Sequence, residues 1–170
     1  MKGIKQRGFT LVEVIVVLVL LGLIFSILLV VYIGGIKNSL GLLKRSESLN
    51  LEGRLFWRFT RSIFGASRVK LVNGTALYLI TTGGNVFRGV VWEAYIYNPQ
   101  NKTLDYYEFP YPPEKIDEIP PQAVSYRLGK FSNFLIMAVD TGRTYGDYSG
   151  LPDKIEVKIN NNTYMFLIGY

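Results

Sequence analysis

The chain has 170 residues, of which 19 are Lys or Arg, 13 are Asp or Glu, and none is Cys or His. It therefore cannot form disulfides, carry a lipid on cysteine, or build nucleophilic triads that use a thiol or an imidazole. The net charge of +6, part of which lies in the first seven residues, is too mild to indicate nucleic acid as a ligand. We do not expect nucleic acid as a partner.

The first 36 residues combine a short basic stretch with a long apolar one. Lys2, Lys5 and Arg7 precede Gly8, and no charged residue occurs from Val14 to Ile36. At about 1.5 Å per helical residue, that run is long enough to cross a hydrocarbon core of ~30 Å. It is too long for the apolar core of an ordinary secretory signal, and no Ala-x-Ala cleavage pattern follows it. The sequence predicts a membrane-spanning helix that stays on the protein.

The junction between the two stretches carries a resemblance to a known family. The run Arg7-Gly8-Phe9-Thr10-Leu11-Val12-Glu13 before an aliphatic helix resembles the prepilin signal of type IV pilins and type II secretion pseudopilins. In that family, a prepilin peptidase of the inner membrane cleaves after the Gly and methylates the new terminal amine. The resemblance implies cleavage between Gly8 and Phe9 and N-methylation of Phe9. One departure is that many pilins have a Pro in the first helix, whereas none occurs here before Pro99.

Glu13 stands at the start of the apolar run. A carboxylate near the bilayer interior is costly unless it meets a positive partner. After cleavage, the free amine of Phe9 in a neighbouring subunit is such a partner, and the ion pair favours stacking of helices at one stagger. We predict that Glu13 acts in filament assembly. The alternative is an acid that only lies at the membrane interface.

The basic residues before the helix predict a single-pass inner-membrane protein with a cytoplasmic N-terminus and an exported C-terminal domain. Helical periodicity continues past the span, with one apolar face and one basic face. The apolar face is made by Leu51, Leu55, Phe59 and Ile63, and the basic face by Arg54, Arg58 and Arg61. We expect the apolar face to pack on a domain. A solvated basic face is favoured over contact with lipid headgroups or a partner subunit.

Alternation with period two and turn residues predict a β-rich remainder. The turn signals are Asn73-Gly74 and Gly83-Gly84, and long loops are expected at Pro110–Pro121 and Thr141–Pro152. Strands are expected at Arg68–Val72, Ala76–Thr82, Val86–Tyr97, Leu104–Phe109, Ala123–Leu128, Phe134–Asp140, Ile155–Ile159 and Thr163–Ile168.

The predicted fold class is α+β, with a long N-terminal helix, transmembrane and then amphipathic, packed on a mostly antiparallel β-sheet head. The expected divisions are a leader at 1–8, a transmembrane and assembly helix at 9–36, its amphipathic continuation at 37–66, and a globular head at 67–170.

No catalytic constellation is found, so we expect a protein that is not an enzyme and has no cofactor. Asp140, Asp147 and Asp153 could offer oxygen ligands to Ca²⁺, but they miss EF-hand spacing, so a plain surface loop is favoured and no metal is expected. Aromatic residues cluster near the long loops, where a core or interface role is favoured over stacking on single-stranded nucleic acid. They are Tyr106, Tyr107, Phe109, Tyr111, Tyr126, Tyr145 and Tyr148.

The sequence favours a structural subunit of a type IV pilus or type II secretion-like pseudopilus. The Leu/Phe/Arg-rich helix from Leu51 to Ser67, followed by short strands, resembles the larger minor pilins and minor pseudopilins. The resemblance implies four partners: prepilin peptidase, other subunits, an inner-membrane assembly platform and membrane lipid. Protein secretion, pilus and competence systems all remain open. The alternative is an uncleaved single-pass anchor that presents a β-rich binding domain outside the cytoplasm.

Overall fold

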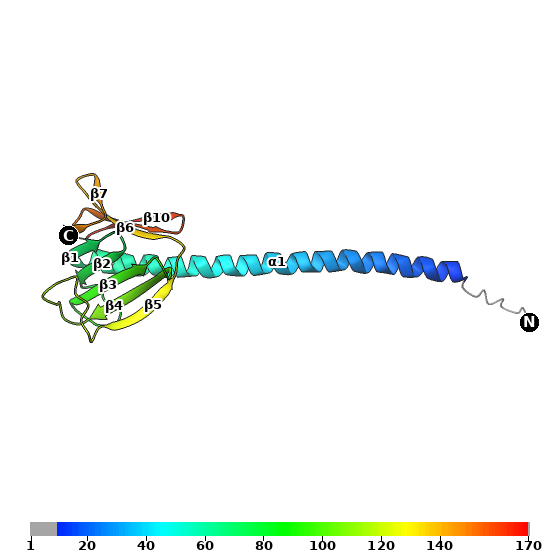
Figure 1. Cartoon of the computed structure of the whole chain (residues 1–170), viewed down its shortest axis with the longest axis horizontal. Coiled ribbons are helices and arrows are strands. Elements are labelled where there is room, and N and C mark those ends of the chain that lie inside the picture. Colours follow the sequence, from blue (N-terminus) through cyan, green and yellow to red (C-terminus); the bar gives the residue numbers. More distant parts are fainter. Residues whose placement is uncertain (1–9, 170) are drawn as a thin grey trace, which may run out of the picture. The chain divides into compact units, whose positions relative to one another are not determined.

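The computed structural model describes residues 10–169, apart from the side chains of seven helical residues: Leu40, Leu43, Lys44, Arg45, Glu47, Ser48 and Leu49. The chain divides into two compact units, Met1–Ser48 and Leu49–Tyr170. One helix, α1 (Leu11–Phe64), contributes residues to both units, and the ten strands found in the described residues all belong to the second (Figure 1). The predicted α+β class is confirmed.

The strands form two antiparallel sheets, where the sequence had suggested one. In spatial order the larger sheet contains β5 (Val124–Lys130), β4 (Thr103–Phe109), β3 (Val91–Asn98), β2 (Ala76–Thr81), β1 (Ala66–Val72) and β8 (Tyr148–Gly150). The smaller sheet contains β10 (Asn162–Leu167), β9 (Lys154–Ile159), β6 (Phe134–Asp140) and β7 (Arg143–Tyr145).

The last turns of α1 supply the apolar face on which both sheets pack. Leu55, Phe59 and Ile63 are at most 1% exposed. The Phe59 ring lies 4.4 Å from the ring of Tyr95 in β3 and 6.2 Å from that of Phe134 in β6, measured between centroids. One side chain of the helix thus contacts both sheets, and the predicted apolar face is confirmed.

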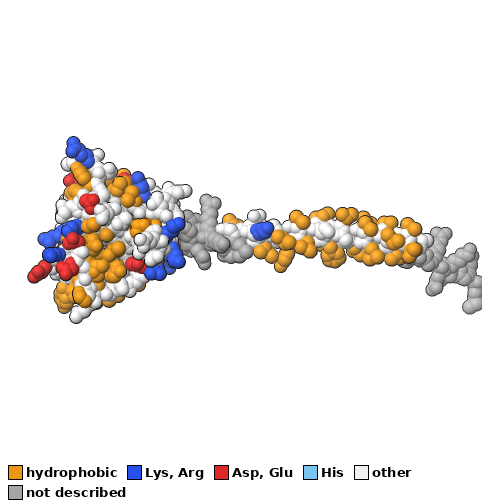
Figure 2. All heavy atoms as spheres, in the orientation of Figure 1, with side chains coloured by type: hydrophobic (Ala, Val, Ile, Leu, Met, Phe, Trp, Pro, Cys, Tyr) orange, Lys and Arg blue, Asp and Glu red, His pale blue; other side chains and the backbone are white. Residues whose placement is uncertain are grey.

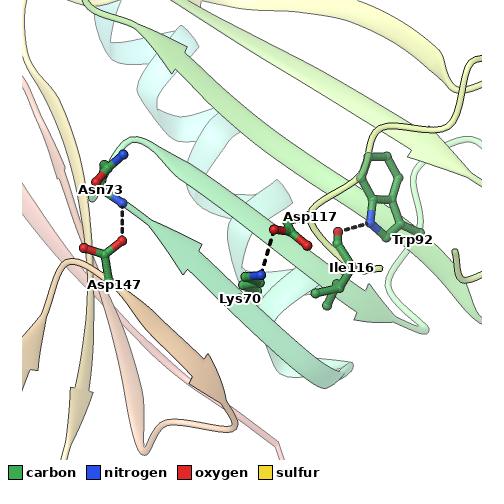
Figure 3. A network of polar contacts seen from close by, with 6 residues as sticks. All are labelled: Lys70, Asn73, Trp92, Ile116, Asp117 and Asp147. Carbon is green, nitrogen blue, oxygen red and sulfur yellow. Dashed lines mark hydrogen bonds and ion pairs between the residues drawn. The ribbon is translucent and has the colours of Figure 1, made fainter. Parts of the chain in front are cut away.

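The outer face of the larger sheet is covered by the Pro-rich segment that follows β4. Ile116 of this segment packs on Trp92, whose Nε1 donates a hydrogen bond of 2.6 Å to the Ile116 carbonyl (Figure 3). Lys70 of β1 and Asp117 form an ion pair of 2.7 Å beside it. Because α1 covers the opposite face, every residue of β2 is buried.

The strand predicted from Val86 begins only at Val91. Tertiary structure overrides the β-type sequence, because the backbone N–H groups of Val86 and Phe87 donate to the Glu108 carboxylate and not to a neighbouring strand. The sequence predicted Gly83 as a turn residue, but the structure requires glycine there because of a close approach to another segment. A Cβ there would lie 2.2 Å from the carbonyl oxygen of Arg61, so only glycine lets this segment approach the end of α1.

The loop predicted at Thr141–Pro152 contains β7 and β8, which pair with β6 and β1 in different sheets. The turn between β1 and β2 bonds to the segment between β7 and β8, where the chain passes from one sheet to the other. Asn73 and Gly74 take the predicted left-handed conformation, with φ of 52° and 64°. Their N–H groups donate to Asp147 Oδ1 and to the Gly146 carbonyl, each over 2.8 Å (Figure 3 shows the Asp147 bond).

The contact at Gly83 predicts opposite effects for two glycine substitutions. Gly83→Ala should lower the free energy of unfolding by about 2 kcal/mol, because the backbone must shift to accept the methyl group. Gly53→Ala, at an exposed helical site where a Cβ meets nothing within 4 Å, should raise it by up to about 1 kcal/mol. Urea unfolding of the full chain in detergent micelles, followed by Trp fluorescence, measures both. A Gly83→Ala protein as stable as the wild type contradicts this account of the close approach.

Candidate functional site

The predicted processing residues directly precede the first described residue, Thr10. Gly8 and Phe9 lie outside the described residues, so their predicted roles are untested by the structure. The described chain begins at Thr10, and Glu13 lies in the first turn of α1. The geometry of this end of the helix therefore rests on Thr10 and Glu13.

Thr10 and Glu13 form a capping box at the start of α1. The Glu13 carboxylate oxygen Oε2 accepts hydrogen bonds from the Thr10 backbone N–H, at 2.9 Å, and from the Thr10 hydroxyl, at 3.0 Å. In return, the Glu13 N–H donates to Thr10 Oγ1 over 3.4 Å. The two residues satisfy backbone donors that a helix start otherwise leaves without partners.

The capping box gives Glu13 a local role that the sequence argument missed, although the Thr-x-x-Glu spacing signals it. Both bonds that the carboxylate accepts from Thr10 use Oε2, so within the described residues Oε1 is open to a second donor. Capping and an ion pair with a neighbouring amine are therefore geometrically compatible. They differ in what they require, because capping needs only an acceptor oxygen, whereas the ion pair needs the negative charge.

The helix that follows Glu13 has an apolar surface that the rest of the chain does not cover. Leu11–Ser39 has the length and the mean hydropathy, 3.5, of a membrane span, and none of it is buried. Figure 2 shows hydrophobic side chains along most of this stretch. The Ser26 hydroxyl donates to the Gly22 carbonyl within the helix, at 2.8 Å, so its polar group is satisfied without water. Such a surface requires lipid or other apolar helices around it.

The three candidate calcium ligands of the second unit bond separately to protein donors. Asp147 accepts from Asn73, Asp153 accepts from the Thr141 N–H, and Asp140 accepts from the Tyr148 hydroxyl. Among the side chains that the structure describes, no group of three from His, Cys, Asp or Glu is placed to hold a metal ion. Each of the three acids thus serves a separate protein donor, and the absence of a metal stays a prediction.

The aromatic cluster proposed from the sequence is largely packed on itself. Ring centroids are 5.0 Å apart for Tyr106 and Tyr126, 5.9 Å for Phe109 and Tyr111, and 5.8 Å for Tyr145 and Tyr148. Tyr106 is completely buried, whereas Tyr111 is 70% exposed. These distances fit the core interpretation for most of the cluster.

Two buried glutamates face each other inside the head, and the sequence analysis missed both. Glu93 of β3 and Glu108 of β4 are direct partners in the antiparallel register, and neither is exposed to solvent. Two carboxylates in this position repel each other if both are ionised. The Glu108 carboxylate is stabilised by the N–H groups of Asn85, Val86 and Phe87, which donate to it over 2.7–3.0 Å.

The count of protons in this cluster requires that one of the two carboxyl groups be protonated, and the N–H groups that donate to Glu108 favour Glu93 as the neutral one. The single Tyr106 hydroxyl lies within hydrogen-bonding distance of both carboxylates, 2.8 Å from Glu93 Oε1 in one case. Its one proton can go to only one of them. If it is donated to Glu108, the bond to Glu93 needs a proton from the Glu93 carboxyl. Burial, helped by the charge of Glu108, raises the pKa of Glu93 to about 7, in agreement with this assignment.

A third buried glutamate, Glu52 of α1, is fully partnered. It is 6% exposed and accepts from Asn160 Nδ2 at 3.0 Å, Asn162 Nδ2 at 2.8 Å and the Tyr164 hydroxyl at 3.0 Å. All three donors come from the hairpin formed by β9 and β10. Glu52 therefore ties the smaller sheet to the helix.

The basic face of α1 is not uniformly solvated, so that expectation was wrong for one of its residues. Arg54 and Arg61 are exposed, but Arg58 is half-buried and its guanidinium donates to the Tyr126 hydroxyl of β5. Sequence reasoning could not foresee the contact, because it depends on which strand lies beside this face of the helix.

The neutral state of Glu93 predicts a pH-dependent stability with a definite sign. The folded-state pKa of about 7 lies above the usual value of 4.5, so the resulting stability is complete below pH 4.5 and is lost as the pH rises through 7. The free energy of unfolding should fall by about 2.5 kcal/mol between about pH 5 and about pH 8. Urea unfolding of the full chain at the two pH values should show this fall for the wild type and for the exposed control Glu118→Gln, but not for Glu93→Gln. An identical fall in Glu93→Gln contradicts the assignment.

Comparison with known proteins identifies the N-terminal region. The family model of the prokaryotic N-terminal methylation motif matches residues 4–29, which include Gly8, Phe9, Thr10 and Glu13. The match covers Lys5 and Arg7 of the basic stretch and most of the apolar run that follows. It supports the predicted resemblance and indicates, together with the apolar helix, that the chain is anchored in a membrane.

The whole chain also has a relative of nearly equal length. An uncharacterized protein of Aquifex aeolicus (strain VF5) is 36% identical over 166 residues, a match that spans 98% of this chain and 94% of that protein. No solved structure matches the chain. The head is thus shared with this relative, whereas the methylation motif connects the chain to a wider group. The chain belongs to one family with this relative. Its N-terminal region carries the prokaryotic N-terminal methylation motif and in this respect is similar to type IV pilin-like proteins.

Proposed function

We propose that the chain is a structural subunit, and a minor one, of a type IV pilus or a type II secretion-like pseudopilus. In this proposal prepilin peptidase cleaves between Gly8 and Phe9, and Phe9 is N-methylated. The precursor crosses the inner membrane once, with its N-terminus in the cytoplasm and its head exported. The observation that carries the proposal is the methylation motif at the start of an apolar helix that the rest of the described chain leaves uncovered.

The same apolar surface of the helix can serve in the membrane and in a filament. In the membrane, its side chains contact lipid. In a filament, the same side chains pack against the helices of other subunits, so transfer between the two exchanges one apolar environment for another. An assembly platform in the inner membrane is the expected partner for this transfer, as the family resemblance implies.

The head offers apolar groups for contacts with neighbouring subunits. Trp57 and Phe64 of α1 are 71% and 64% exposed, and Met165 and Leu167 of β10 are 57% and 65% exposed. Large apolar side chains at the surface favour burial against another protein. The proposed role is structural and involves no reaction, in accord with the lack of Cys and His in the sequence.

The capping box allows a test that separates the charge of Glu13 from its role at the helix end. Glu13→Gln keeps an oxygen that can accept from Thr10 but removes the charge. Thr10→Ala removes the side-chain cap but keeps the charge. If Glu13 pairs with the amine of Phe9 in a neighbouring subunit, Glu13→Gln should reduce incorporation into sheared filaments by about tenfold or more, because an unpaired buried amine is costly. Thr10→Ala should incorporate nearly as well as the wild type.

The measurement is an immunoblot of filament and membrane fractions from the native host. Both variants should be present in the membrane and cleaved like the wild type, which controls for expression and processing. Normal incorporation of Glu13→Gln together with loss of incorporation in Thr10→Ala contradicts the ion pair and assigns Glu13 to helix capping alone.

A further inference from the structure

A basic pocket lies between α1 and the edge strand β5 of the head. It has a volume of about 290 Å³, and Arg54, Arg58 and Arg127 line it together with Tyr126 and apolar side chains that include Leu51 and Leu128. Strand β5 is at the end of the larger sheet, so one of its edges has no partner strand among the described residues. Three arginine residues, two from α1 and one from β5, thus line one small space.

Arg58 is held in place by a neutral partner. Its Nη1 donates to the Tyr126 hydroxyl, and its Cζ lies 5.0 Å from the centroid of the Tyr126 ring and 5.9 Å from that of Tyr106. An aromatic face and a phenol fix the guanidinium in position without neutralising its charge. Among the described side chains, no carboxylate forms an ion pair with Arg58 or Arg54.

The third arginine belongs to an exposed ion pair that a ligand can readily replace. Arg127 Nε lies 3.2 Å from Asp105 Oδ1, and the Arg127 side chain is 59% exposed. Surface pairs of this kind contribute little stability. Arg127 can therefore exchange Asp105 for another acceptor at small cost.

An irregularity in β5 shapes the pocket wall. Leu104 pairs with Gly129 and Asp105 pairs with Arg127, so Leu128 is an extra residue that bulges from the ladder. At Gly129 a Cβ would lie 2.8 Å from Leu51 Cδ2, so the glycine allows the strand to approach α1. Bulges re-aim side chains and are frequent beside binding sites. Here the bulge lies between Arg127 and the point of contact with the helix.

We infer that this pocket binds a carboxylate side chain from an acidic segment of a partner protein. The fork of a guanidinium matches a carboxylate with two parallel hydrogen bonds, and Arg58 is already positioned to make them. The leucine side chains of the wall suit the methylene groups that an Asp or Glu side chain brings with it, which a bare phosphate lacks. Because the bulge and the basic side chains discourage strand addition at the edge, the ligand is assigned to the pocket and not to the β5 backbone. The site does not depend on filament assembly.

The test uses the full chain in zwitterionic detergent micelles, with a fluorescein-labelled hexaglutamate peptide as the probe and hexaglutamine as its uncharged counterpart. Fluorescence anisotropy of the peptide measures binding, and about 150 mM salt limits the contribution of distant charges to the affinity. The wild type should bind hexaglutamate and not hexaglutamine. Arg54→Glu, at an exposed position that leaves the packing of Arg58 intact, should weaken binding about tenfold or more.

Arg143→Glu is the matched control, because it makes the same charge change at an exposed site in β7 of the other sheet. It should change the affinity by less than about twofold. Equal loss in the two variants, or no binding of hexaglutamate by the wild type, overturns the proposal. Competition identifies the source of the anion. Glutarate should displace the probe better than glycerol phosphate, and the reverse order overturns the carboxylate assignment in favour of a phosphate-bearing ligand such as a lipid headgroup.

Discussion

The burial of one helical face by two sheets is the interaction on which the head depends. Leu55, Phe59 and Ile63 are almost completely buried, and complete burial of such side chains is worth about 1.5–3 kcal/mol each. Since Phe59 contacts rings from both β3 and β6, neither sheet has a complete core without the helix. The polar bonds follow the same arrangement, because Glu52 is held by the β9–β10 hairpin and Ser62 bonds to Tyr95 of β3.

The apolar span of the first unit is built on the opposite principle, because the described part of the chain buries none of it. The span Leu11–Ser39 is unburied throughout, and its first turn holds an acid that Thr10 partly satisfies. A helix of this kind obtains its stability from its surroundings, either lipid or neighbouring helices. The methylation motif covers the start of this helix. In the proposed function, processing of the terminus and assembly through the apolar surface therefore involve the same end of the helix.

Local sequence signals predicted much of the fold. The period-four apolar face of α1, the Asn73-Gly74 turn and strands such as β6 and β9 follow from patterns within a few residues. What the sequence could not reveal depends on contacts between distant segments. Residues 85–87 leave the strand pattern because Glu108 accepts their N–H groups, and β8 joins the larger sheet through the turn at Asn73.

The same distinction applies to the candidate sites. Gly8, Phe9 and Glu13 are recognisable because their motif is contiguous in the chain, and the Thr10 cap is visible in the same few residues. The basic pocket joins arginines from α1 to a strand about 70 positions later, and its key contact, Arg58 with Tyr126, spans 68 residues. Periodicity placed Arg54 and Arg58 on one face of the helix, but it carried no information on the strand that lies beside them.

The most direct test of prepilin-type maturation is the mass of the N-terminal peptide of the protein isolated from native membranes. The account predicts a peptide that begins at Phe9 and carries the added mass of one methyl group on its terminal amine. A peptide that begins at Met1 or Lys2 contradicts it, because the basic leader is then a permanent cytoplasmic flank and the chain is an anchored domain that does not mature as a pilin.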